Sequence, residues 1–247
     1  MSENPETWFH RFHPGAVTRP RLVCFPHAGG SASFYFPLSR ALSASIEVLA
    51  VQYPGRQDRR AERPVEDLPE LAGRIEAALA GTEPRPTAFF GHSMGALVAF
   101  ELARRLGPGA APQMLFASGR RAPSSARRTA VHLLDDDGVL AEVRKLSGTD
   151  ARVLQDKELM RTVLPAIRAD YRAAETYACP PDATVGCPIT ALTGDRDPHV
   201  TRAEAEGWAR HTGAAFALRV LPGGHFFLTA CQDQIVETVT RQLLTPA

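Results

Sequence analysis

A serine flanked by glycines lies near the middle of the chain, in Gly91-His92-Ser93-Met94-Gly95. The apolar run 87–90 before it and the alanine- and leucine-rich stretch 96–103 after it are typical of a strand and a helix. Between a strand and a helix, G-x-S-x-G predicts a nucleophile elbow, a strained turn that lifts the serine hydroxyl above the sheet. A Cβ atom at Gly91 or Gly95 would hold the strand and the helix apart. The pattern predicts Ser93 as a nucleophile.

Two later motifs offer the acid and the base that a serine hydroxyl needs, because the hydroxyl alone is a poor nucleophile. Asp197 and His225 each follow an expected strand, the first three residues after Gly194 and the second directly after Gly223-Gly224. The carboxyl ends of parallel strands share one edge of a sheet, where such sheets bind ligands. The chain order Ser, Asp, His is that of the α/β-hydrolases. We expect His225 to take the proton of Ser93 and Asp197 to orient the imidazole.

Other residues compete for these two roles. Asp195 is the alternative to Asp197, which is preferred because the loop can turn back towards the histidine within three residues of the strand. His199 is the strongest alternative to His225, but it would lie beside the acid rather than opposite it. His92, next to the serine, is expected to point away from it.

A tetrahedral oxyanion needs two backbone N–H donors. One is expected from Met94, the residue after the nucleophile, and the other from the glycine-rich loop 27–31 after the first buried strand. We assign the second donor to Ala28. The histidines and cysteines are not at metal-ligand spacing, and the phosphate-binding glycine patterns do not occur, so neither a metal nor a cofactor is expected.

The segments that must position these residues alternate between strand and helix composition, which predicts parallel strands joined by crossover helices on both faces of a central sheet. Strands are expected at 8–12 (an edge strand), 21–25, 46–53, 87–90, 113–118, 189–193 and 216–221. Helices are expected to begin at Ser31 or Ser33 and to span 67–80, 96–103, 202–211 and 227–244.

Residues 119–186 depart from this alternation, with helical stretches near 135–143 and over 158–177 and no convincing strand. An insert of this kind usually covers a site, so we expect a helical lid over about residues 120–186. The alternative is a helical excursion that has no role in the site.

The composition limits the possible partners. A length of 247 residues fits one α/β domain spanning residues 1–247, and a net charge of +1 argues against a nucleic-acid partner. Four cysteines without C-x-x-C spacing favour a reducing compartment. The N-terminus has no signal-peptide pattern, and no apolar run reaches the ~18 residues that span a bilayer. We therefore expect a cytoplasmic protein with no membrane partner.

Several stretches resemble the type II thioesterases that serve polyketide and nonribosomal peptide synthases, and the resemblance runs from about Trp8 to Gln242. The stretches are Phe25-Pro26-His27-Ala28-Gly29-Gly30-Ser31-Ala32, Tyr53-Pro54-Gly55-Arg56, Gly91-His92-Ser93-Met94-Gly95-Ala96, Leu164-Pro165-Ala166-Ile167-Arg168-Ala169-Asp170-Tyr171 and Gly223-Gly224-His225-Phe226-Phe227. G-x-S-x-G alone would fit any esterase, whereas Pro54-Gly55-Arg56 together with the segment up to Tyr177 is much narrower.

The resemblance implies an α/β-hydrolase fold and hydrolysis of short, stalled acyl thioesters from the phosphopantetheine arm of acyl or peptidyl carrier proteins. It implies Ser93, Asp197 and His225 as the triad, with Ala28 and Met94 as the oxyanion hole. It places Tyr171 in the lid that shapes the acyl pocket, and His27 and Phe226 are further candidates for substrate contact.

Three other functions remain open from the sequence. The same triad would serve a carboxylesterase for small oxygen esters or an acyltransferase whose acceptor is not water. A protein that binds a synthase without turnover is disfavoured, because it has no use for a complete triad.

Two arginine clusters could meet an acidic carrier protein, although such clusters are more often solvated surface. They are Arg56, Arg59, Arg60 and Arg63, and Arg120, Arg121, Arg127 and Arg128. Nothing in the sequence demands a partner subunit, so we expect a monomer.

Overall fold

The computed structural model describes residues 3–14, 19–125, 129–146 and 157–244, and every structural statement below refers to these residues. Its centre is a seven-stranded sheet with the order β1-β3-β2-β4-β5-β6-β7. Strand β1 runs antiparallel to β3, and all other neighbouring strands are parallel. The strands are β1 (Phe9–His10), β2 (Arg21–Phe25), β3 (Glu47–Val51), β4 (Thr87–His92), β5 (Leu115–Ser118), β6 (Ile189–Gly194) and β7 (Phe216–Leu221).

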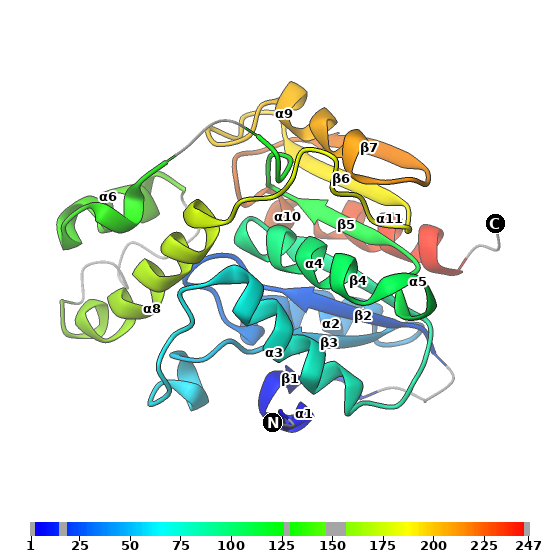
Figure 1. Cartoon of the computed structure of the whole chain (residues 1–247), viewed down its shortest axis with the longest axis horizontal. Helices are drawn as coiled ribbons and strands as arrows, with labels where there is room; N and C mark the ends of the chain where they lie inside the picture. The colour runs from blue at the N-terminus through cyan, green and yellow to red at the C-terminus, as the bar shows by residue number, and fades with distance from the viewer. Residues whose placement is uncertain (1–2, 15–18, 126–128, 147–156, 245–247) are drawn as a thin grey trace.

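Helices cover both faces of this sheet (Figure 1). On one face lie α3 (Leu68–Ala80) and α4 (Met94–Arg105), and on the other lie α2 (Phe36–Leu42) and α11 (Gln232–Leu244). The remaining helices are α1 (Pro5–Trp8), α5 (Gly107–Ala110), α6 (Asp136–Lys145), α8 (Lys157–Thr176), α9 (Arg202–Glu206) and α10 (Phe227–Ala230). Short 3-10 turns are η1 (Ala32–Tyr35), η2 (Gln57–Arg59), η3 (Val131–Leu133) and η4 (Gly207–His211).

Side chains of the central strands alternate between two apolar cores, because successive residues of a strand point to opposite faces. Phe89 packs into the core beneath α3 and α4, whereas Phe90 packs into the core beneath α2 and α11. Cys24 is fully buried in this second core, as its apolar surroundings in the sequence predict. Two covered faces explain why β2, β3 and β5 are buried along their whole length.

Three elements differ from the predicted bounds for local reasons. Trp8 ends α1 instead of starting a strand, because the Asn4 side chain accepts the Glu6 N–H and nucleates that helix. Ser31 precedes η1, but its hydroxyl bonds to Ser33 and does not cap a helix. The predicted C-terminal helix is interrupted at Cys231, whose backbone leaves the helical region between α10 and α11.

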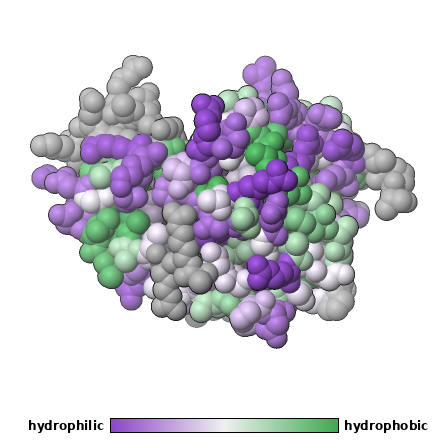
Figure 2. Space-filling view, turned by 90° about the horizontal axis from the view of Figure 1, so that it is seen from above, coloured by the Kyte–Doolittle hydropathy of each residue, from purple (hydrophilic) through white to green (hydrophobic). Residues whose placement is uncertain are grey.

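The insert between β5 and β6 holds η3, α6 and α8, which lie to one side of the sheet (Figure 1). The Asp135 side chain caps α6 by accepting the Gly138 N–H at 2.8 Å, in agreement with the predicted helix start. Apolar residues of α6 and α8 form a small core of their own. Seen from above, hydrophilic and apolar side chains are mixed over the surface, and one of the apolar patches is on the side where these helices lie (Figure 2). Among the described helices, none combines the length and apolar character needed to cross a bilayer.

Candidate active site

Ser93 occupies the turn between β4 and α4, with φ 54° and ψ −117°, a conformation that residues other than glycine rarely adopt. A Cβ atom at Gly91 would lie 2.2 Å from the Gly95 carbonyl oxygen, and one at Gly95 would lie 2.0 Å from that of Phe25. Both contacts involve backbone and are too short for any side chain. The two glycines are therefore required for the close approach that presents Ser93 at the carboxyl edge of the sheet.

An acid and an imidazole meet at the neighbouring strand ends. His225 Nδ1 lies 2.8 Å from Asp197 Oδ2, and the two side chains are 3% and 0% exposed. The other carboxylate oxygen, Oδ1, accepts the backbone N–H of His199 at 2.8 Å. A carboxylate at Nδ1 holds the proton there, which leaves Nε2 as the basic nitrogen.

The competing residues Asp195 and His199 make other contacts. The half-exposed Asp195 carboxylate accepts the Gly223 N–H at 2.7 Å, so it joins the two loops without contacting the imidazole of His225. The His199 ring lies 5.6 Å from the His225 ring, and the backbone N–H of His199 bonds to Asp197. The structure thus pairs Asp197, rather than Asp195, with His225.

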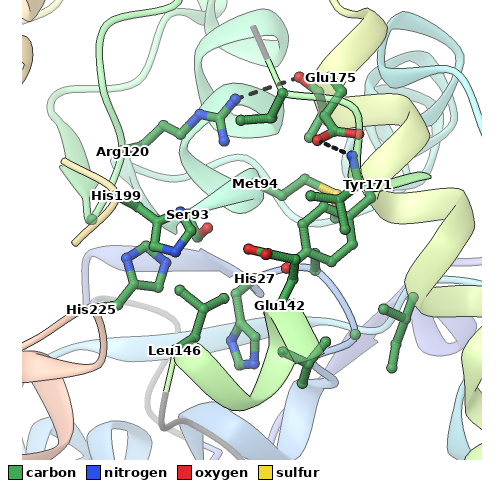
Figure 3. Close-up of a pocket in the computed structure, with 18 of the residues that line it drawn as sticks. His27, Ser93, Met94, Arg120, Glu142, Leu146, Tyr171, Glu175, His199 and His225 are labelled. Carbon is green, nitrogen blue, oxygen red and sulfur yellow. Dashed lines mark hydrogen bonds between the residues drawn. The ribbon is translucent and has the colours of Figure 1, made fainter. Parts of the chain in front are cut away.

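All the predicted site residues except Asp197, which lies behind His225, line one cavity of about 230 Å³. They are His27, Ala28, Ser93, Met94, Tyr171, His225 and Phe226. Figure 3 shows Ser93, His199 and His225 on one side of this cavity and Tyr171 of α8 on another. The described part of the insert therefore contributes a wall to the cavity that contains the nucleophile.

The two residues predicted to supply the oxyanion donors, Ala28 and Met94, both line the cavity that contains Ser93. Met94 is the first residue of α4, so its N–H has no partner within the helix and lies at the positive end of the helix dipole. Ala28 lies in the loop after β2 and faces the same cavity. The arrangement can stabilise negative charge on a carbonyl oxygen that Ser93 attacks.

Several cavity residues were not predicted from the sequence. Arg120 is the most unusual of them, because burial lowers the pKa of its guanidinium to about 9 and Arg121 acts in the same direction. Among the described residues, its Nε atom has no hydrogen-bond partner. Its place two residues after β5, at the same sheet edge as Ser93, is the signal that could have identified it. Glu142, Glu175 and His199 also line the cavity.

Two further histidines, His27 and His92, lie next to His225 and are uncharged at neutral pH. Burial lowers the pKa of His27 to about 3, and the nearby His225 and Arg56 lower it as well. Burial also holds the pKa of His92 well below its usual value, with His225 and His27 adding to the effect. The His92 ring is enclosed in the interior, 5.1 Å from the His225 ring, where its Nδ1 bonds to Ser118 Oγ at 3.0 Å. Neither side chain adds positive charge beside His225 at neutral pH.

We expect the free energy of unfolding to fall when the solution is acidified from pH 7 to pH 5. The folded protein keeps His27 neutral, whereas the unfolded chain protonates it below its ordinary pKa of 6.5, so protons favour the unfolded state. For His27 alone the loss is about 2 kcal/mol at pH 5. Urea unfolding of the wild type and of His27→Gln at both pH values measures it. The variant should lose less stability than the wild type, and an equal loss would contradict the assignment.

Two of the four arginines in the first cluster are not on the surface. Arg56 and Arg59 are buried, the former in an ion pair with Asp170 and the latter against Trp8, 4.2 Å from its ring centre. Only Arg60 and Arg63 of this cluster are exposed.

The second arginine cluster also has fewer arginines on the surface than the sequence suggests. Arg121 is buried and Arg120 lines the cavity, so neither is available as part of an open arginine patch. Arg127 and Arg128 lie outside the described residues.

The family model for the thioesterase domain matches residues 20–243. The chain belongs to the thioesterase family. It is 54% identical to Thioesterase PikA5 of Streptomyces venezuelae, covering 96% of this chain and 85% of that relative. It is 55% identical to a probable cadicidin biosynthesis thioesterase of Streptomyces griseus, and here it covers 97% of its own length but 66% of the relative, just under two thirds.

Solved structures of other thioesterases share the fold. The type II thioesterase BorB, from the borrelidin biosynthetic cluster, superposes with a TM-score of 0.90 at 49% identity, over 98% of this chain and 99% of that one. RedJ, from the prodiginine pathway of Streptomyces coelicolor, gives 0.84 at 36% identity over 93% and 90%. The predicted α/β-hydrolase fold and the resemblance to type II thioesterases are confirmed.

Proposed function

We propose that this thioesterase hydrolyses short acyl thioesters carried on the phosphopantetheine arm of acyl or peptidyl carrier protein domains, and so clears stalled groups from a polyketide or nonribosomal peptide synthase. The observation that carries the proposal is the buried Asp197–His225 pair beside Ser93 at one end of a small cavity. YbtT, a type II thioesterase of an NRPS/PKS biosynthetic pathway with a similar fold, supports the same class of synthase.

Each residue has a step in the reaction. Ser93 attacks the thioester carbonyl while His225 Nε2 takes its proton, and Asp197 stabilises the resulting imidazolium. The oxyanion binds the N–H groups of Ala28 and Met94. The intermediate then breaks its carbon–sulfur bond, and the thiol leaves with the proton of the imidazolium. Water attacks the acyl-Ser93 ester with His225 as base again, releasing the free acid.

The size of the cavity limits the acyl group. A volume of about 230 Å³ is below the ~300–1,000 Å³ of pockets that hold drug-sized ligands. A short acyl chain gains only ~0.8 kcal/mol for each buried methylene. Selectivity among carriers therefore comes from contacts to the arm and the carrier surface, and the cavity sets the upper limit of chain length.

The setting of the enzyme follows from the same proposal. We place it in the cytoplasm, a reducing compartment in which its four unpaired cysteines stay reduced. It acts as a monomer without a bound cofactor, because the described residues of one chain provide every group that the reaction needs.

A hydrolysis panel tests the proposed substrate class. One carrier protein is loaded with acyl chains of increasing length, and the same acyl groups are offered as small oxygen esters. We expect release of free acid and regeneration of the carrier thiol, fastest for short chains, with much slower turnover of the oxygen esters. A strong preference for oxygen esters would indicate a carboxylesterase, and acyl transfer to an added acceptor without free acid would indicate an acyltransferase.

A further inference from the structure

A buried ion pair joins the lid helix to the loop that holds one of the oxyanion donors. Arg56, in the segment after β3, pairs through its Nη2 with Asp170 Oδ2 of α8, and the two side chains are 7% and 2% exposed. Both partners also bind the loop after β2. Asp170 Oδ2 accepts the Gly29 N–H at 2.7 Å, and Arg56 Nε donates to the Gly30 carbonyl at 3.0 Å.

The energetics of burial make stability an insufficient reason for this pair. Two charges that leave water lose several kcal/mol of hydration each, and a well-packed apolar pair of the same size is often at least as stable. Burial raises the pKa of Asp170, and the Arg56 guanidinium and the Gly29 amide oppose that shift. The two charged side chains instead fix the orientation of the loop, since one binds the Gly29 N–H and the other binds the Gly30 carbonyl.

The loop itself depends on these contacts. Gly29 has φ +75°, and a Cβ atom there would lie 2.8 Å from Ile167 Cγ1, so α8 rests directly on the loop. The Gly30 N–H closes a turn onto the His27 carbonyl at 2.9 Å, with Ala28 inside that turn. Holding Gly29 and Gly30 in place thus fixes the direction in which the Ala28 N–H points.

We propose that Asp170 and Arg56 are positioning residues for the oxyanion hole, which is complete only when α8 is seated on the loop. The inference rests on the proposed function, because it concerns the same reaction. The proposal also predicts selection against large acyl groups. A chain too long for the cavity displaces α8, withdraws Asp170 from Gly29 and removes stabilisation from the transition state, so that kcat falls as well as affinity.

The test uses two variants and a matched control. Asp170→Asn keeps the shape but leaves a buried arginine unpaired, which can itself prevent folding. Arg56→Gln combined with Asp170→Asn removes both charges and leaves no buried ion alone. The control is Arg172→Gln, which breaks the exposed pair of Arg172 Nη1 with Glu66 Oε2 at 2.7 Å, another link between α8 and the segment after β3. Active enzyme is counted by titration of Ser93 with a fluorophosphonate.

We expect kcat per active site to fall about 10- to 100-fold in the double variant, with KM changed less than about threefold. Affinity for a trifluoromethyl ketone analogue of the acyl-pantetheine, which forms the oxyanion on the enzyme, should fall by the same factor as kcat/KM. The control should match the wild type in all three measurements. A folded double variant with wild-type kcat and inhibitor affinity would overturn the proposal. A wild-type enzyme inactive on acyl-carrier thioesters would count against the proposed function instead, and the inhibitor affinities would still test the positioning.

Discussion

Replacement of Ser93 by alanine is expected to reduce thioester hydrolysis by at least about 10³-fold without disturbing the fold. The hydroxyl is the group that forms the acyl intermediate, whereas the turn around it is held by Gly91 and Gly95 and by a backbone bond from the Ser93 N–H to Ser118 O at 2.8 Å. Release of free acid from acyl-pantetheine measures the activity, and thermal unfolding checks the fold.

Ser43→Ala provides the matched control, since its hydroxyl donates to the Arg40 carbonyl at the end of α2 and Ser43 does not line the cavity. It should retain wild-type activity. Hydrolysis by a folded Ser93→Ala variant at more than a few per cent of the wild-type rate would show that another nucleophile carries the reaction.

The second large effect is expected for Asp197→Asn, with kcat lowered by about 10⁴-fold. The amide has nearly the shape of the carboxylate, but it cannot stabilise an imidazolium, and its NH₂ group can present a donor where His225 Nδ1 needs an acceptor. Progress curves on a small acyl thioester at neutral pH measure the change.

Asp195→Asn is the matched comparison for the acid. Its side-chain oxygen can still accept the Gly223 N–H, and it does not contact the imidazole, so the variant should stay within a few-fold of the wild type. Were Asp195→Asn the more damaging of the two, the roles of the two aspartates would have to be exchanged.

Local patterns predicted the parts of the molecule that depend on neighbours in sequence. The inner strands β2, β3, β5 and β6 are apolar runs buried on two faces, so their positions can be predicted without a structure. Gly91 and Gly95 are likewise required by a turn of five residues. Capping of α6 by Asp135 also depends only on the next few residues. The order of strand ends along one sheet edge then brings Ser93, Asp197 and His225 to the same side.

Contacts between distant segments were not predictable in this way. Arg56 and Asp170 are 114 positions apart, and nothing in the composition of either segment distinguishes a buried ion pair from two solvated side chains. The same limit explains Arg59, which looked like part of an exposed basic cluster and instead covers the Trp8 ring. Arg120 was predictable in part. Its place after β5 indicates the site, but its burial depends on the distant helix α8.

Trapping the acyl-enzyme tests the central claim most directly, because the other residues of the site are all assigned to help the Ser93 hydroxyl oxygen form and release the acyl intermediate. A carrier protein loaded with a short acyl chain is mixed with the enzyme, the reaction is quenched in acid within milliseconds, and the digested enzyme is analysed by mass spectrometry. We predict the mass of the acyl group on the peptide that contains Ser93, accumulating before free acid is released and missing from Ser93→Ala. Release of free acid by the wild type with the acyl group on another residue, or with the same rate in Ser93→Ala, would contradict the account.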